Sequence, residues 1–322
     1  MPAVTVEDTL VLPRIPRPDP AASRPRPVAK VVGSHAGTEG AGVPIRRVFP
    51  GPVAMSEADP FLLLDHAGPT LNRPGEAKGA PWHPHRGFET VTYMLDGELA
   101  HRDTTGGGGV IAEGETQWMT AGAGIQHEEL PTEQLYRMGG MFQAVQLWVN
   151  LPPALKMTTP RYQSITGDSL RLLTSDDGGA LVRLIAGNIG GFDGPGVIHT
   201  PITYTHVTLA PGAQLSAPWN PAFSAFAYVL AGRGTVGAEG RPLDAGELAV
   251  FGLGDHLVVS AAVHTAPLEV LLLGGLPIGA PIAHYGPFVM NTREEILQAI
   301  DDYERGRLGT IPADQLAPRS FA

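Results

Sequence analysis

Two histidines and a carboxylate stand close together in the stretch PWHPHRGFET at residues 81–90. They are His83, His85 and Glu89, and all three would point to one side if the stretch is a strand, because residues two apart on an extended chain share a face. Pro84 has no backbone N–H and fixes its own φ, which favours a strand start or a sheet edge over a helix. Imidazole and carboxylate groups on one face can bind a metal ion, but a single HxH pair also fits a patch of hydrogen-bonded imidazoles. The rest of the chain has to decide between these interpretations.

A second cluster, GIQHEEL at residues 124–130, places His127 and Glu129 two apart. Both would face one side of a strand, while Glu128 would face solvent on the other side. In a small antiparallel barrel the inward positions of neighbouring strands converge, so the two clusters can surround one ion. Such a set can hold an octahedral divalent metal with two open positions, as in non-haem iron enzymes, and a closed four-coordinate zinc site is the rival. The predicted ligands are His83, His85, His127 and Glu129.

Other polar residues give weaker signals. His101 lies beyond the Asp96–Gly97 pair, where its strand parity cannot be fixed, and a hydrogen-bonded structural histidine is the better interpretation. Gln117, Trp118 and Met119 can line a pocket near the metal, although core packing explains them equally well. The remaining histidines of the second half lack HxH or HxE spacing, which gives a second metal site little support. They are His199, His206, His256, His264 and His284.

The composition excludes several classes of protein. A length of 322 residues fits roughly two domains, and 43% hydrophobic residues are enough for substantial cores. The net charge of -10 argues against nucleic-acid binding through broad attraction to phosphates. Because there is no cysteine, disulfides, thiolate ligands and thiol nucleophiles are excluded, and any redox chemistry must use a cofactor. We find neither a secretory leader pattern nor an apolar run of about 20 residues, and expect a cytoplasmic protein without membrane contact.

Short apolar runs punctuated by glycine and proline fill residues 40–275. The 41 glycines and 31 prolines suit many turns between short strands, so we expect mainly β structure. The Asp96–Gly97 pair lies between apolar runs and predicts a hairpin in which strands Thr90–Leu95 and Glu98–Arg102 pair with each other.

The sequence also contains an internal repeat. PWHPHRGFETVTYMLDG at 81–97 resembles PWNPAFSAFAYVLAG at 218–232, and EGETQWMTAGAGIQHEE at 113–129 resembles AGELAVFGLGDHLVVSA at 245–261. The two halves are therefore expected to be copies of one β domain.

The second copy lacks the candidate ligands. The alignment sets His83 against Asn220, His85 near Ala222 and His127 against Val259. Two copies of one scaffold thus differ at the positions that would carry the metal, so the fold itself does not require the histidines.

The two ends of the chain differ from the middle. Prolines and arginines crowd the first thirty or so residues, a pattern that resists both helix and sheet and favours a flexible or surface-draped arm. Near the other end, residues 291–309 have a capping box from Thr292 to Glu295 and a helix-ending glycine at Gly306, which together predict a helix. Its apolar face would pack on a β domain while Arg293, Asp301 and Glu304 stay exposed. The predicted apolar face consists of Ile296, Leu297 and Ile300.

Three motifs identify a resemblance. HPHRGFETVTYMLDGELAHRD, TQWMTAGAGIQHEELP and the late YGPFVMNTREEI resemble the signatures of the pirin family, and the match covers about residues 40–310. The resemblance implies a bicupin, mainly β, with two antiparallel jelly-roll barrels face to face and a C-terminal helix. Together with the composition of the two ends, it leads us to expect a proline-rich arm at 1–38, a metal-binding barrel at 39–165, a degenerate barrel with the terminal helix at 166–310, and a tail at 311–322.

The resemblance also implies the ligand set. The family's HxH and HxE motifs carry over to His83, His85, His127 and Glu129, with one divalent metal, usually Fe(II), although Ni, Cu, Mn and Zn accept the same ligands. Ordinary cupins use a carboxylate four residues after the HxH, which is Glu89 here. We therefore expect Glu129 as the ligand and Glu89 as a residue that orients a ligand histidine or Arg86.

Two functions remain open at this stage. The resemblance implies a quercetin 2,3-dioxygenase-type enzyme, a flavonol 2,4-dioxygenase that cleaves a small aromatic flavonol with dioxygen and uses Glu129 or Glu89 as the base. The alternative is a metal-dependent regulator without turnover, a transcription cofactor or a partner of a metabolic enzyme. Such a partner could dock on the arm between Arg14 and Arg26, although an unstructured tail also explains that stretch. A monomer is the default expectation.

Overall fold

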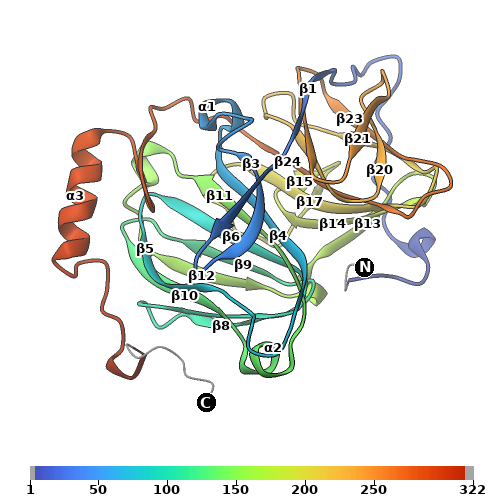
Figure 1. Ribbon diagram of the computed structural model, residues 1–322. Helices are drawn as coiled ribbons and strands as arrows, with labels where there is room; N and C mark the ends of the chain where they lie inside the picture. Colours follow the sequence, from blue (N-terminus) through green and yellow to red (C-terminus); the bar gives the residue numbers. More distant parts are fainter. Residues whose placement is uncertain (1–3, 316–322) are drawn as a thin grey trace.

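Antiparallel sheets make up most of the molecule and form two barrels of one design (Figure 1). The computed structural model describes residues 4–315. Each barrel consists of a large sheet of seven strands that faces a small sheet of four. The expected mainly β architecture with two antiparallel barrels is confirmed. Residues 1–3 of the predicted arm and 316–322 of the predicted tail lie outside the described residues.

The N-terminal barrel contains the candidate ligands. Its large sheet has, in spatial order, β12 (Arg161–Ile165), β9 (Thr116–Thr120), β6 (Phe88–Asp96), β11 (Gly140–Asn150), β4 (Phe61–Asn72), β3 (Val43–Phe49) and β2 (His35–Glu39). Its small sheet has β5 (Ala80–His85), β10 (Ile125–Pro131), β7 (Leu99–Asp103) and β8 (Gly108–Ile111). Two short helices belong to this half, α1 (Met55–Ala58) and α2 (Glu133–Met138).

The C-terminal barrel repeats this order. Its large sheet has β1 (Val28–Gly33), β22 (Glu247–Phe251), β19 (Phe226–Ala231), β24 (Leu268–Gly275), β17 (Ile202–Leu209), β14 (Ala180–Ala186) and β13 (Arg171–Thr174). Its small sheet has β18 (Gln214–Pro218), β23 (His256–Ala261), β20 (Arg233–Val236) and β21 (Arg241–Asp244). Two two-stranded sheets complete the described fold, β15 (Asn188–Ile189) with β16 (Phe192–Asp193), and β25 (Ala283–Tyr285) with β26 (Phe288–Met290).

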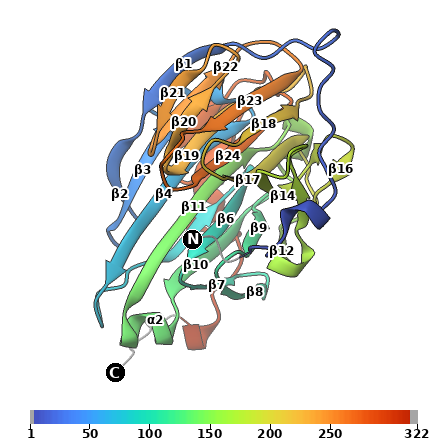
Figure 2. The same cartoon turned by 90° about the vertical axis from the view of Figure 1, so that its right-hand side faces the viewer.

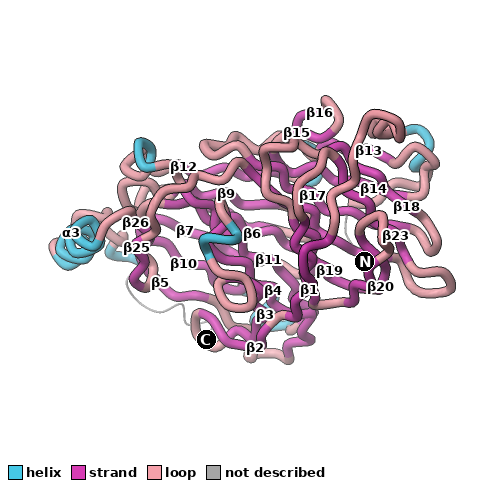
Figure 3. Tube along the Cα trace, turned by 90° about the horizontal axis from the view of Figure 1, so that it is seen from above, coloured by secondary structure: helices cyan, strands magenta, loops and turns pink. Residues whose placement is uncertain are grey.

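The two large sheets pack against each other, so that each strand in them has one face toward the partner barrel and one toward its own interior (Figure 3). Along β6, Val91, Tyr93 and Leu95 belong to the core between the barrels, whereas Met94 belongs to the interior core. This alternation follows from the two-residue period of a strand. The alternation therefore determines which side chains face the interior of the barrel, where the cluster of candidate ligand histidines lies.

The internal repeat is visible at the interface between the barrels. Tyr93 and Tyr228 occupy matching positions in the two copies, and each hydroxyl meets a histidine of the opposite barrel. Tyr93 Oη lies 2.8 Å from His206 Nδ1, and Tyr228 Oη lies 3.1 Å from His66 Nδ1. The duplication predicted from the sequence is thus built into the interface as two equivalent contacts.

The predicted hairpin at Asp96–Gly97 is wrong. Strand β6 pairs with β9 and β11 in the large sheet, whereas β7 pairs with β10 and β8 in the small sheet. Gly97 has a φ of +83°, as the turn signal predicted, but the turn carries the chain from one sheet to the other. A chain that closes a barrel has to change sheets, and tertiary packing decides where this happens.

The N-terminal arm is more ordered than its composition predicts. Residues Val28–Gly33 form β1, which pairs with β22 and completes the C-terminal large sheet at the edge that β12 occupies in the other barrel (Figure 2). Arg26 is buried and donates hydrogen bonds to the carbonyl oxygens of Gly252, Gly254, Asn220 and Pro221. The arm therefore drapes over the C-terminal barrel, and the expectation that it resists sheet formation is wrong for β1.

The predicted C-terminal helix is α3 (Arg293–Glu304), and its capping box between Thr292 and Glu295 is present. Ile296 is buried as predicted, but Leu297 is 54% exposed and does not belong to the packed face. The helix follows the C-terminal barrel in the chain but lies on the side of the N-terminal one, where it packs on β25 and β26 (Figure 1). In the described part of the chain no helix has the length and apolar character needed to cross a membrane.

Candidate metal centre

Three imidazoles meet where β5 and β10 lie side by side. His83 and His85 point inward from β5, and His83 pairs in register with His127 on β10. The ring centroids are 4.7 Å apart for His83 and His85, 4.3 Å for His83 and His127, and 4.9 Å for His85 and His127. One ring nitrogen from each lies within 4.8 Å of the others, a spacing that suits one ion. The structure thus brings the three predicted histidines together.

Backbone carbonyl groups orient two of these rings. His83 Nδ1 lies 2.7 Å from the carbonyl oxygen of Pro81, and His85 Nδ1 lies 3.3 Å from that of Pro287. A carbonyl oxygen only accepts, so each Nδ1 carries the proton and donates. The Nε2 atom of each ring is consequently left with a free lone pair, which is the form that binds a metal.

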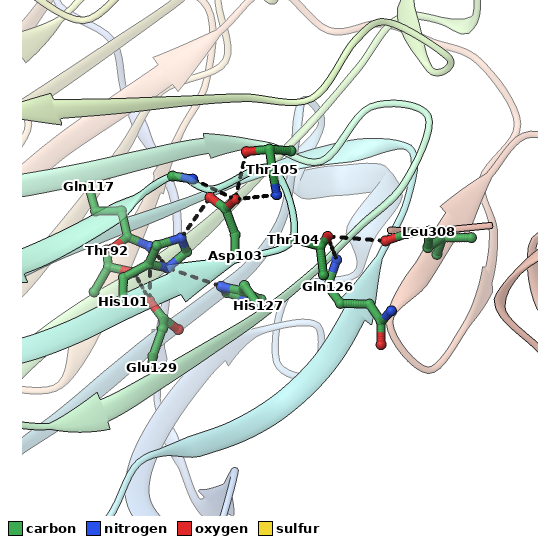
Figure 4. Close-up of polar contacts among 11 residues, drawn as sticks. Thr92, His101, Asp103, Thr104, Thr105, Gln117, Gln126, His127, Glu129 and Leu308 are labelled. Carbon is green, nitrogen blue, oxygen red and sulfur yellow. Dashed lines mark hydrogen bonds and ion pairs between the residues drawn. The ribbon is translucent and has the colours of Figure 1, made fainter. Parts of the chain in front are cut away.

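His127 supplies the observation that tests whether a metal fits. Its side chain is fully buried, and its Nε2 has no hydrogen-bond partner among the described residues. Its Nδ1 lies 3.3 Å from Nδ1 of His101 (Figure 4). A buried nitrogen without a partner is costly unless something satisfies it. A metal ion bound also by His83 and His85 would do so, and the donor set therefore fits the predicted cofactor.

Glu129 lies two residues along β10, on the same inward face. Its Oε1 accepts a hydrogen bond from Thr92 Oγ1 at 2.7 Å and one from Gln117 Nε2 at 3.3 Å. Because both bonds end on Oε1, Oε2 is left for a metal or a proton. Glu129 also has a ligand atom within 4.8 Å of those of His101 and His127. The carboxylate predicted to complete the cluster is thus next to it.

His101 is the residue that the sequence left out of the cluster, and the structure places it there. It pairs in register with Glu129, and its Nε2 lies 3.2 Å from Asp103 Oδ2. Gln117 Nε2 lies 2.7 Å from its Nδ1 (Figure 4). His101 is a hydrogen-bonded histidine, as expected, but it also touches His127. One sequence signal could have placed His101 in the cluster. AHRD contains an HxD spacing, the same two-residue step as in HxH and HxE.

Glu89 lies apart from the histidines. The turn at Arg86 and Gly87, with a φ of +90° at the glycine, ends β5 and starts β6 in the other sheet, so the two-residue period does not continue across it. Glu89 has the parity of Val91 and faces the core between the barrels, where it accepts a hydrogen bond from Thr120 Oγ1 at 2.6 Å. The expected common face of His83, His85 and Glu89 is therefore wrong.

Arg86 is also turned away from the metal cluster. Its Nε donates to the carbonyl oxygen of Ala123 at 2.6 Å, and its Nη1 forms a 2.8 Å ion pair with Asp302 on α3. The arginine thus links the helix to the turn that follows the HxH motif. Among the described residues, Arg86 forms no hydrogen bond with Glu89.

A cavity of about 720 Å³ opens beside the cluster. His83, His85 and Glu129 line it, whereas Glu89 does not. Its wall is mostly apolar, and it includes Trp148, whose ring centroid lies 5.2 Å from that of His85. A cavity of this size and lining is typical of a small-molecule site.

Comparison with known proteins identifies the family. The Pirin family model matches residues 42–149, and the model for the pirin C-terminal cupin domain matches residues 204–309. A pirin-like protein from Caulobacter vibrioides is 42% identical over 88% of this chain and 99% of its own length. A pirin-like protein from Solanum lycopersicum is 40% identical over 89% of this chain and 94% of its own length. The chain belongs to the pirin family.

A solved structure supports the fold of this pirin. A crystal structure of quercetin 2,3-dioxygenase from Acinetobacter baumannii is 36% identical and superposes with a TM-score of 0.84, covering 90% of this chain and 100% of that one. The bicupin fold implied by the resemblance is confirmed.

The interior of the C-terminal barrel of this pirin is apolar, and it lacks the candidate metal ligands of the N-terminal barrel. Strand register pairs Leu257 with Ala217, and Val259 with Val236, where the N-terminal barrel pairs His127 with His83, and Glu129 with His101. The sequence alignment set His127 against Val259, and the register shifts this by two residues to Leu257. Ala217, Val236, Leu257 and Val259 all lie in one apolar core cluster. The described residues hold no second metal-binding group there.

Burial determines the protonation state of two of the candidate ligand histidines. It lowers the pKa of His85 and of His127 well below that of a free imidazole, and the neighbouring imidazoles lower it further. Both rings are therefore neutral at pH 7, the state required of a metal ligand.

Proposed function

We propose that this pirin is an iron-dependent flavonol dioxygenase of the quercetinase type, which uses one metal in the N-terminal barrel. The observation that carries the proposal is the position of the cluster at the wall of the cavity, where His83, His85 and Glu129 face the space that a substrate would fill. The similarity to a quercetin 2,3-dioxygenase over nearly the whole chain supports the substrate class.

Three imidazoles, His83, His85 and His127, have ligand atoms within 4.8 Å of one another and fit one metal ion. Glu129 forms a second group with His101 and the shared His127, and in this proposal it is the carboxylate ligand. Divalent iron bound there would supply a Lewis acid and a position for dioxygen, while the protein fixes the ligands through Pro81, Pro287 and Thr92. The same ligand types also accept nickel, copper, manganese and zinc, so the choice of iron is part of the proposal.

The chain's own residues would prepare the substrate. The apolar wall around Trp148 would hold the flat rings and exclude water. Glu129 would take the proton of the flavonol 3-hydroxyl on a second lone pair of Oε2, the oxygen that would also face the metal, since Thr92 and Gln117 already occupy Oε1. The resulting anion is electron-rich and can add the two atoms of dioxygen at C2 and C4 of its central ring. The C2–C3 and C3–C4 bonds then break, C3 leaves with its own oxygen as carbon monoxide, and the depside keeps both atoms of dioxygen and takes the proton back from Glu129. We do not assign Glu89 a part in these steps, because it faces away from the cavity.

The test is carbon monoxide release. Protein purified without air is analysed for metals and then given quercetin and dioxygen, with oxygen uptake and carbon monoxide measured together. We expect both signals in the wild type, and we expect both to be lost in His83→Ala. The matched control is His35→Ala, an exposed histidine on β2 that is far from the cluster in sequence and outside it. Tightly bound metal without any carbon monoxide would refute the enzyme and support the regulatory alternative.

A further inference from the structure

One row of polar side chains crosses the interior face of the large N-terminal sheet. In register across five neighbouring strands, the row consists of Arg47, Asp65, Gln146, Thr92 and Gln117. The first four of these residues line the cavity. The interior of a small barrel is ordinarily filled by apolar side chains, so a polar row of this length needs an explanation.

Hydrogen bonds connect the row to the metal cluster. Arg47 donates from Nε to Asp65 Oδ1 at 2.7 Å, and Thr92 Oγ1, whose single proton is shared between Glu129 Oε1 and Gln146 Oε1, lies 2.6 Å from the latter. Thr92 also contacts Glu129, the candidate ligand. The row therefore runs from the carboxylate of the cluster to the far side of the cavity. Three steps between strands separate Thr92 from Arg47, a span of about 14 Å at the usual strand spacing.

The rows above and below are mainly apolar. On one side lie Ile45, Ala67, Ala144 and Met94, and on the other lie Leu63, Trp148, Thr90 and Met119. A flat aromatic molecule placed along the row would touch apolar side chains with its faces and polar groups with its edge.

The second barrel shows that the fold does not need this row. The matching register positions there hold Leu184, Thr205, Leu272, Ala227 and Ala249. Four of the five are apolar residues in the core of that barrel. Asp65 by contrast is 4% exposed, and burial raises the pKa of its carboxyl group despite the ion pair with Arg47. A buried carboxylate that the scaffold does not require is kept at a cost in stability, which points to a role in binding.

We propose that Arg47, Asp65 and Gln146 recognise the hydroxyl groups on the ring of the substrate that lies farthest from the metal. This inference rests on the proposed function, and it adds the feature that selects among flavonols: a second ring with adjacent hydroxyls. Asp65 accepts a hydrogen bond from a phenol, and Gln146 donates one and accepts another. The row thus favours the binding of a flavonol with a catechol as its second ring over one whose second ring has no hydroxyl group.

The test compares two flavonols that differ only in that ring. Quercetin carries two adjacent hydroxyls on it, and galangin carries none. Dissociation constants are measured by quenching of tryptophan fluorescence in the metal-loaded protein without dioxygen, so that no turnover is needed. We expect the wild type to bind quercetin about tenfold more tightly than galangin, since one hydrogen bond to a buried partner is worth about that factor.

Two variants test the residues. Gln146→Leu installs the residue type that the second barrel has at this position, and Asp65→Asn removes the charge while keeping the shape. In both we expect the ratio of the two dissociation constants to fall toward one, with metal content and circular dichroism as in the wild type. The matched control is Gln214→Leu, an exposed glutamine on β18, for which the ratio should equal that of the wild type.

The outcomes separate this inference from the proposed function. If both variants still bind quercetin tenfold more tightly than galangin, the row does not recognise the hydroxyls of the second ring. The inference is then refuted, even when carbon monoxide is released from quercetin. If no flavonol yields carbon monoxide but the preference exists and the variants lose it, the enzyme proposal falls and the recognition of catechols is supported.

Discussion

The position of Glu89 leads to a prediction that separates its two interpretations. As a catalytic base it would be required for activity. As a carboxyl group buried between the barrels it lowers the free energy of unfolding at neutral pH. Burial raises its pKa to about 7 against the ordinary value of 4.5, and the hydrogen bond from Thr120 offsets only part of this effect. We therefore expect Glu89→Gln to keep its activity and to change how stability depends on pH.

The magnitude follows from the linkage between proton binding and folding. Between pH 4.5 and 7 the folded state keeps a proton on Glu89 that the unfolded state has released, so the wild type loses stability as the pH rises through this window. A shift from 4.5 to about 7 corresponds to about 3 kcal/mol, at 1.36 kcal/mol for each pKa unit. Glutamine has no such proton, and its Oε1 can still accept from Thr120. The variant should thus gain about 3 kcal/mol relative to the wild type between pH 4.5 and 8.

Urea unfolding measures this difference directly. Both proteins are unfolded at a series of pH values in the presence of a chelator, so that metal binding does not contribute, and the two free energies are subtracted at each pH. Glu304→Gln, a change at an exposed glutamate on α3, is the control, and its difference from the wild type should stay flat. A flat difference for Glu89→Gln as well would refute the reasoning, and so would loss of carbon monoxide release in a correctly folded variant.

Three further predictions concern the ligands and the C-terminal helix. His127→Ala should lower the metal affinity at least tenfold, because it removes a buried donor from the cluster, and competition with a chelator measures this. Ile296→Ala should destabilise the protein by about 2–4 kcal/mol because the side chain is buried, whereas Leu297→Ala should change the unfolding free energy by less than about 0.5 kcal/mol. Equal effects of the two would show that the helix packs through a different face. Asp302→Asn should cost about 1–3 kcal/mol in urea unfolding, since it leaves the buried guanidinium of Arg86 without its ion pair, and an unchanged midpoint would contradict that account.

The sequence determined the chemistry of the site and the repeat that frames it. The common inward face of His83 and His85, and that of His127 and Glu129, could be predicted because a two-residue step on a strand places side chains on one face whatever the rest of the fold does. The second copy of the barrel, which lacks these residues, indicated that they serve function. Local signals also placed the capping box of α3, since a cap involves only residues within one turn.

Tertiary structure decided everything that depends on which sheet a strand joins. The turn at Asp96–Gly97 was predicted, but only the closure of the barrel shows that it links two sheets, and the turn at Gly87 likewise sends Glu89 away from the histidines that precede it. The row from Arg47 to Gln117 is spread over five strands that are distant in the chain, so no spacing in the sequence reveals it. Strand periodicity is a local property, whereas the pairing of strands is set by the packing of the whole barrel. The sequence therefore determined which residues are the candidate metal ligands, and only the fold decided what surrounds them.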